Sequence, residues 1–258
     1  MHDLKIAGIQ TELFWEDIDK NIEHFYAKID SISEDVDLII LPETFSTGFS
    51  MNQSITEPMN GKAVSWIKQK AIEKKCCIGG SVLITENGEF YNRMIIAKSD
   101  GEILTYDKRH LFSFGDEDKH FSPGNERVVF ELNGWKICPQ ICYDLRFPVW
   151  SRNTSEIDLY VYVANWPEVR KNPWSNLLIS RAIENVSYVI GVNRVGFDGT
   201  DKNYSGNSVI IDYKGEEISQ IPEYKNHIEI TTLNKQNLID FRAKFSALND
   251  GDKFKIVN

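Results

Sequence analysis

The chain has 258 residues, of which 41% are hydrophobic, and its formal net charge at pH 7 is −9. A chain of this length can bury one large core, so we expect a single domain over residues 1–258 that needs no disulfide scaffold. The acidic balance argues against nucleic acid as a partner, because nucleic-acid phosphates are bound by clustered lysine and arginine side chains.

Strand and helix patterns alternate through the first half of the chain. Apolar side chains recur at helical spacing over residues 17–33, whereas the short apolar run over residues 37–41 is typical of a buried strand. Asn87 and Gly88 predict a tight hairpin turn. In chain order, we expect a strand over residues 4–13, a helix over 17–33, a strand over 37–41, a helix over 61–75, strands over 76–84, 89–97 and 103–106, and a polar loop over 107–124.

The second half repeats this layout without a linker or an internal repeat. Runs that are apolar on both faces belong in a sheet covered on both sides, so the pattern predicts an α/β layered protein. We expect strands over residues 127–132 and 135–141, a short helix near Pro148, a strand over 157–163, a helix over 172–185, strands over 188–193, 208–213 and 227–232, and a last helix over 235–245.

Several function classes lack their sequence signals in this chain. No apolar run approaches the roughly 18 residues that a membrane span requires, and the amino terminus has no signal-peptide pattern. We therefore expect a cytoplasmic protein with no membrane partner. The histidines form no H-x-x-x-H pair, the cysteines form no C-x-x-C pair, and G-x-G and G-x-S-x-G motifs are absent. We accordingly expect no metal site, no dinucleotide cofactor and no serine nucleophile.

Three reactive side chains each follow an apolar run, namely Glu43, Lys108 and Cys142. If the fold brings them together, the site would contain a base, a fixed cation and a soft nucleophile, which suits acyl transfer through a thioester. Lys108 would favour the thiolate of Cys142 and, with the backbone N–H of Tyr143, would hold the oxyanion of a tetrahedral intermediate. Each residue also has a structural explanation, as a loop carboxylate, a solvated lysine and a buried inert thiol.

A redox pair of Cys138 and Cys142 would be a rival role for the same thiol. In a strand, these two Cα atoms would lie about 13 Å apart, whereas a disulfide spans at most about 7 Å. A binding or redox-sensing module with an idle site remains the non-enzymatic alternative.

The stretches Leu41 to Glu43, Tyr106 to Leu111 and Ile141 to Pro148 resemble the three motifs of the nitrilase superfamily of carbon–nitrogen hydrolases. The resemblance implies a four-layer α-β-β-α sandwich that assembles as a homodimer or a higher homo-oligomer. It also implies hydrolysis of a small linear amide to a carboxylic acid and ammonia, without a metal or a cofactor. Cys142 would attack the amide carbon, Glu43 would act as base and then as acid, and Lys108 would stabilise the oxyanion.

Members of this superfamily carry a second glutamate on a loop before a Ser/Thr-Pro-Gly turn, and residues 115–124 are similar to that stretch. Glu117 is our choice for this carboxylate, which would keep Lys108 charged and fix its direction. Asp116 or Asp118 could occupy the same position, because the register within this acidic stretch is open.

Two further stretches, Ala164 to Pro167 and Asn193 to Gly196, are similar to the omega-amidase branch. This branch hydrolyses monoamides of 2-oxo dicarboxylic acids, such as 2-oxoglutaramate and 2-oxosuccinamate. Such substrates carry a carboxylate, so the pocket needs a second cation, for which Arg170 is the candidate, and Trp166 is expected in the pocket wall.

Two charged neighbours of the nucleophile, Asp144 and Arg146, are expected to support the turn. A nitrilase, an N-carbamoyl amidase and a deaminated-glutathione amidase stay open as alternatives, because one triad serves all of these reactions.

Overall fold

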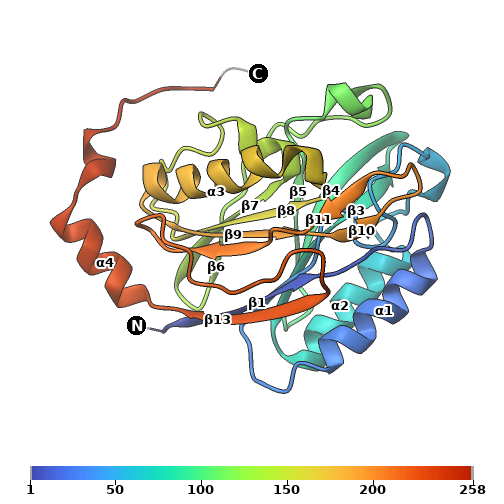
Figure 1. Cartoon of the computed structure of the whole chain (residues 1–258), viewed down its shortest axis with the longest axis horizontal. Coiled ribbons are helices and arrows are strands. Elements are labelled where there is room, and N and C mark those ends of the chain that lie inside the picture. The colour runs from blue at the N-terminus through green and yellow to red at the C-terminus, as the bar shows by residue number, and fades with distance from the viewer. Residues whose placement is uncertain (1, 257–258) are drawn as a thin grey trace.

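Two β-sheets packed face to face form the centre of the structure, a computed structural model that describes residues 2–256 (Figure 1). Helices α1 and α2 cover the outer face of one sheet, and α3 covers the outer face of the other, which confirms the expected α-β-β-α sandwich. The covering helices are α1 (Ile18–Asp30), α2 (Lys62–Lys74) and α3 (Lys171–Asn185), and α4 (Lys235–Lys244) follows the last strand.

The strand order places parallel strands at the centre of each sheet. The first sheet has the order β13-β1-β2-β3-β4-β5, and the second has the order β12-β9-β8-β7-β6. The first sheet contains β1 (Leu4–Gln10), β2 (Leu38–Ile40), β3 (Cys77–Glu86), β4 (Glu89–Ala97), β5 (Ile103–Asp107) and β13 (His227–Leu233). The second contains β6 (Phe130–Leu132), β7 (Trp135–Ile141), β8 (Leu159–Ala164), β9 (Tyr188–Asn193) and β12 (Val209–Ile211).

Side chains of each strand alternate between two cores, because successive residues of a strand point to opposite faces. In β7, Ile137 and Ile141 point between the sheets, whereas Cys138 points toward α3. In β1, Ile6 points between the sheets and Ile9 packs on the side of α1 and α2. This double burial explains why the central strands are apolar on both faces.

Polar residues of the candidate site follow the carboxyl ends of the parallel strands. Glu43 follows β2, while Cys142 and Asn165 follow the neighbouring parallel strands β7 and β8. Ligand sites of open α/β sheets commonly lie at these ends, because polar groups there escape the apolar cores.

Two expected elements are shifted or shorter in the structure, and one element was not expected. The short helix is a 3₁₀ helix at Cys142–Arg146 and ends before Pro148, because the residue preceding a proline is disfavoured in a helix. The strand expected over 127–132 pairs with β7 only at Phe130–Leu132, and the Arg127 side chain before it donates to the backbone oxygen of Arg152 at 2.6 Å. The structure also contains a small hairpin that was not expected, formed by β10 (Val195–Phe197) and β11 (Asn203–Ser205).

Within residues 2–256, no helix is long and apolar enough to cross a membrane.

Replacing Ile137 by alanine tests the packing between the sheets. Ile137 has 0% exposure there, so Ile137→Ala should lower the free energy of unfolding by about 2–5 kcal/mol through lost contacts and a residual cavity. The matched control is Ile72→Ala on α2, where the side chain is 46% exposed and the loss should stay near about 0.5 kcal/mol. Urea unfolding of the two variants gives both values, and equal losses would contradict the described core.

Candidate active site

The structure brings together three of the side chains expected to carry chemistry. The ammonium of Lys108 lies 2.9 Å from Glu43 Oε1 and 3.0 Å from Glu117 Oε1. All three side chains have 0% exposure. Burial opposes the charge on Lys108, but the carboxylates of Glu117 and Glu43 together raise its pKa above the ordinary value for lysine. Lys108 is therefore a permanent cation between two carboxyl groups.

Two asparagines hold the Glu43 carboxylate in place. The Asn92 side chain on β4 donates to Glu43 Oε1 at 2.8 Å and to Glu117 Oε1 at 3.2 Å. The backbone N–H of Asn165 donates to Glu43 Oε2 at 2.7 Å, and its side chain donates to the backbone oxygen of Glu43 at 2.7 Å. Neither role was expected from the sequence, because Asn92 lies beside the charged Arg93 in its strand and has no distinguishing spacing.

The loop after β5 turns Glu117 inward and its acidic neighbours outward. Glu117 Oε2 accepts a hydrogen bond of 2.6 Å from the backbone N–H of Phe112, and the pKa of Glu117 is raised by burial against the opposing effect of Lys108. Asp116 is exposed and pairs with Lys119 at 2.7 Å, and Asp118 is exposed. Of the three acids considered for this position, the structure therefore places only Glu117 on Lys108.

Cys142 sits at a strained point where β7 turns into the 3₁₀ helix. Its φ is +46°, in the left-handed region that L-residues rarely adopt and that costs about 1–3 kcal/mol. Asp144 holds this turn, because its carboxylate accepts from the backbone N–H of Ile141 at 3.0 Å, from the Tyr106 hydroxyl at 2.7 Å and from the backbone N–H of His110 at 2.9 Å. Asp144 thus supports the turn, as the sequence predicts.

Cys142 is a half-buried residue that lines the cavity, and its thiol lies close to both Glu43 and Lys108. Burial and the Glu43 carboxylate raise the pKa of Cys142 well above its ordinary value, while Lys108 acts in the opposite direction. The expectation that Lys108 would favour the thiolate is correct in direction, but the other two effects are larger. The resting nucleophile is consequently a thiol, and a base must remove its proton during the reaction.

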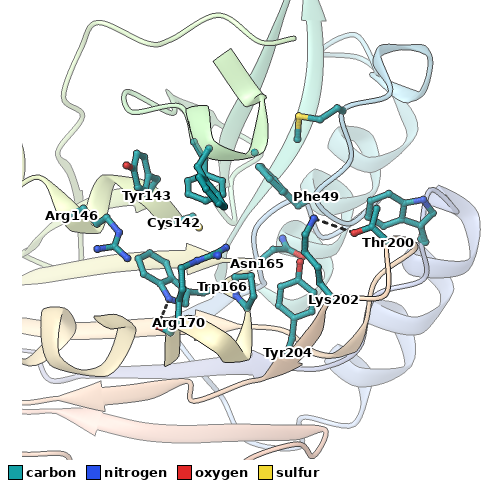
Figure 2. Close-up of a pocket in the computed structure, with 16 residues that line it drawn as sticks. Phe49, Cys142, Tyr143, Arg146, Asn165, Trp166, Arg170, Thr200, Lys202 and Tyr204 are labelled. Carbon is teal, nitrogen blue, oxygen red and sulfur yellow. Dashed lines mark hydrogen bonds between the residues drawn. The ribbon is translucent and has the colours of Figure 1, made fainter. Parts of the chain in front are cut away.

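A cavity of about 260 Å³ opens beside Cys142 (Figure 2). Trp166 lies in its wall, as expected, and donates its indole N–H to the backbone oxygen of Arg170 at 2.7 Å. Tyr143 also lines the cavity, and the role of its backbone N–H stays a prediction. The remaining apolar wall comes from Trp15, Phe49, Met51, Phe112, Phe114, Pro167 and Tyr204.

Cationic side chains complete the lining. Arg170 reaches the cavity, with its guanidinium 5.2 Å from the ring centre of Phe112. The interpretation of Arg146 as a support of the turn is wrong, because its guanidinium faces the cavity, 5.1 Å from the ring centre of Trp166. Lys202 on the missed hairpin is a third cation. In the part of the chain that the structure describes, no group of three or more His, Cys, Asp or Glu side chains could hold a metal ion.

Comparison with known proteins gives consistent matches along the chain. Residues 5–243 match the model of the carbon–nitrogen hydrolase family. The chain is 43% identical to the omega-amidase YafV of Yersinia enterocolitica, over 100% of both chains, and 34% identical to the 2-oxoglutaramate amidase of Bacillus subtilis, over 83% of this chain and 85% of that protein. It is also similar to the solved structure of XC1258 from Xanthomonas campestris, a CN-hydrolase superfamily protein with an arsenic adduct in the active site. That similarity has a TM-score of 0.97 and 41% identity, with 100% of both chains covered.

Alkylation tests whether Cys142 is the accessible thiol. We expect iodoacetamide to modify Cys142 faster than Cys76, Cys77 or Cys138 near neutral pH, because only Cys142 lines the cavity. Burial raises the pKa of all four thiols, to about 11 for Cys76 and Cys138 and to about 12 for Cys77, so the expected difference in rate comes from access to the reagent. Peptide mass mapping over time gives the four rates, and Cys142→Ala should remove the fast phase. Equal rates at all four positions would count against an accessible nucleophile.

Proposed function

The chain belongs to the carbon–nitrogen hydrolase family, and on this premise we propose that it is an omega-amidase that hydrolyses the amide of 2-oxoglutaramate or 2-oxosuccinamate to a carboxylate and ammonia. The membership confirms the resemblance that the three motifs predict. The observation that carries the proposal is the convergence of Glu43, Lys108 and Glu117 beside the one cysteine that lines the cavity.

In the first half of the reaction, the sulfur of Cys142 attacks the amide carbon while Glu43 takes the thiol proton. The carbonyl oxygen becomes an oxyanion, which the ammonium of Lys108 and the backbone N–H of Tyr143 stabilise. Glu43 then gives the proton to the leaving nitrogen, the C–N bond breaks, and ammonia departs from a thioester on Cys142. The raised pKa of Cys142 supports this order, because the thiol keeps its proton until Glu43 removes it.

In the second half, water replaces ammonia and the same groups act again. Glu43 takes a proton from the water, whose oxygen attacks the thioester carbon under the same oxyanion stabilisation. The C–S bond breaks, the proton returns to the sulfur of Cys142, and the carboxylic acid leaves. Glu117 acts as a positioning residue in both halves, because its carboxylate is bonded to Lys108, Asn92 and the backbone N–H of Phe112 and acts on the substrate through Lys108.

The cavity supports a small substrate that carries a negative charge. Its volume of about 260 Å³ is at the lower end for ligand sites, and its walls are mainly apolar. We propose that Arg170 binds the substrate carboxylate and that Trp166 packs on its carbon chain. Two relatives that match over most of the chain bear the names of enzymes acting on such amides.

We further propose that residues 1–258 act as one carbon–nitrogen hydrolase domain that assembles into a homodimer or a higher homo-oligomer in the cytoplasm. Two isoleucines one turn apart on α3, Ile179 and Ile183, are 36% and 52% exposed, which supports a contact on this side of the fold. All four cysteines are free thiols, which is typical of a reducing compartment.

A panel of amides tests the substrate. Ammonia release should be fastest with 2-oxoglutaramate or 2-oxosuccinamate. These small amides carry a carboxylate and an uncharged 2-oxo group, whereas the α-ammonium group of glutamine or asparagine would require a carboxylate in the cavity wall. Glutamine, asparagine, a carbamoyl amino acid and a nitrile complete the panel, and Cys142→Ala is the blank for every substrate. A preference for glutamine, the carbamoyl compound or the nitrile would contradict the omega-amidase assignment, while ammonia release by Cys142→Ala would contradict the mechanism.

Two neighbouring acids give a matched test of the second carboxylate. Glu117→Gln should lower kcat by about 10²-fold, because the oxyanion donor Lys108 loses the partner that directs it, and KM should change little. Asp118→Asn removes a similar charge from an exposed neighbour and should keep kcat within about twofold of the wild type. Steady-state kinetics and thermal unfolding of both variants separate a loss of catalysis from a loss of folding. Equal kcat values in the two variants would refute the role of Glu117.

A further inference from the structure

Three cations line the cavity, while no aspartate or glutamate of residues 2–256 is in its wall. These cations are Arg146, Arg170 and Lys202, and none of them lies within 4.0 Å of a carboxylate oxygen in that part of the chain. Figure 2 shows them entering from different elements, with Arg146 and Lys202 on opposite sides of the Arg170 side chain. A substrate with a single carboxylate needs fewer cations than this, so the third one requires a separate explanation.

Lys202 is held at the cavity mouth by a hydrogen-bonded hairpin tip. Asp198 Oδ1 accepts from the backbone N–H and the hydroxyl of Thr200, each at 2.8 Å, and from the backbone N–H of Lys202 at 3.1 Å. The Lys202 ammonium then donates to the Thr200 hydroxyl at 3.1 Å (Figure 2). The Asp198 carboxylate is thus occupied by the hairpin itself, and the ammonium of Lys202 remains available to a ligand.

A buried arginine anchors this hairpin to the body of the fold. Arg194 has 0% exposure, and its guanidinium donates to the backbone oxygens of Phe197 at 2.7 Å and Val195 at 3.2 Å. It also packs 4.7 Å from the ring centre of Tyr204, whose hydroxyl donates to Asp198 Oδ2 at 2.8 Å. Burying an arginine without a carboxylate partner costs free energy, and the hydrogen bonds of Arg194 to the hairpin offset this cost while they fix the position of the hairpin.

We infer that the hairpin tip makes the site select 2-oxo acid amides over α-amino acid amides, with Lys202 as the residue that repels an α-ammonium group. The inference rests on the proposed function and extends it to glutamine and asparagine. Both types of substrate offer a carboxylate to the arginines, but only the amino acids bring a positive charge against a wall that has three cations and no carboxylate. The carboxylates of Glu43 and Glu117 lie behind this wall and are already paired with Lys108. A 2-oxo group instead presents an uncharged carbonyl oxygen, which can accept a hydrogen bond from the lysine ammonium.

Two physical effects make this repulsion sufficient for selection. Lys202 is exposed, so water partly screens its charge, but the apolar wall beside it lowers the effective dielectric constant on the cavity side and strengthens the repulsion of a like charge there. Specific sites commonly reject a competitor by an unfavourable contact rather than by a better contact to the preferred ligand. Lys202 can supply that contact without touching the reacting atoms.

Charge substitution at Lys202 tests the inference. The measured quantity is kcat/KM for 2-oxoglutaramate divided by kcat/KM for glutamine. Lys202→Met should lower this ratio about tenfold, and Lys202→Glu, which supplies the missing carboxylate, should lower it about 100-fold and bring glutamine turnover well above that of the wild type. Thr200→Val, which removes the hydroxyl that holds the ammonium, should lower the ratio about threefold.

The controls separate selectivity from folding and from the proposed function. Lys68→Met removes an exposed lysine of α2 and should leave the ratio unchanged, and thermal unfolding checks every variant. Three outcomes would overturn the inference and leave the proposed function intact. They are a wild-type ratio in both Lys202 variants, an equal loss of kcat/KM for both substrates, and glutamine turnover that stays at the wild-type level in Lys202→Glu. A wild type that hydrolyses the neutral amide butyramide but not 2-oxoglutaramate would instead refute the proposed function, and the inference with it.

Discussion

The ammonium of Lys108 between two buried carboxyl groups is the contact on which the rest of the site depends. Taking three ionisable groups out of water costs several kcal/mol per ion, and only close pairing offsets this cost. Loss of one partner would leave an uncompensated buried charge, at a cost of about 3–5 kcal/mol. The cluster therefore ties the end of β2, which carries Glu43, to the segment after β5 that carries Lys108 and Glu117, 65 residues further along the chain for Lys108.

Two residues in the left-handed backbone region lie beside this cluster. Thr44, which follows Glu43, has a φ of +44°, and Cys142 has a φ of +46°. A β-branched residue in the left-handed region is a genuine outlier, so the surrounding contacts must over-determine it. Asn165 supplies part of this support, since its side chain donates to the Thr44 hydroxyl at 3.1 Å and its backbone holds the Glu43 carboxylate. One asparagine thus stabilises both a strained turn and the catalytic base that precedes it.

Features of the site that depend on local pattern could be predicted from the sequence, and those that depend on packing could not. An apolar run that ends in one reactive residue is a local signal, and it identified the segments of Glu43 and Cys142. The inward direction of Glu117 among three acids depends on its contact with Lys108, which no spacing encodes. Arg146 was misassigned because an arginine beside a nucleophile can turn toward the protein or toward the cavity, and packing of its guanidinium on Trp166 decides the direction. The hairpin β10–β11 was not expected because each strand has only three residues, which is too short to show the apolar alternation of a core strand.

The resting charge state of Cys142 follows from competition between these groups. Lys108 alone would favour a thiolate, but its charge is already compensated by two carboxyl groups, and burial together with Glu43 raises the pKa of the thiol. A thiolate is both the better nucleophile and the form that oxidants attack, so a protonated Cys142 is protected while the site is empty. Activation then requires Glu43 to take the proton as the amide carbonyl approaches Lys108, when the developing oxyanion can pair with that ammonium. The same contacts therefore keep the free thiol protonated and poorly nucleophilic, and they allow it to react when an amide is bound in the cavity.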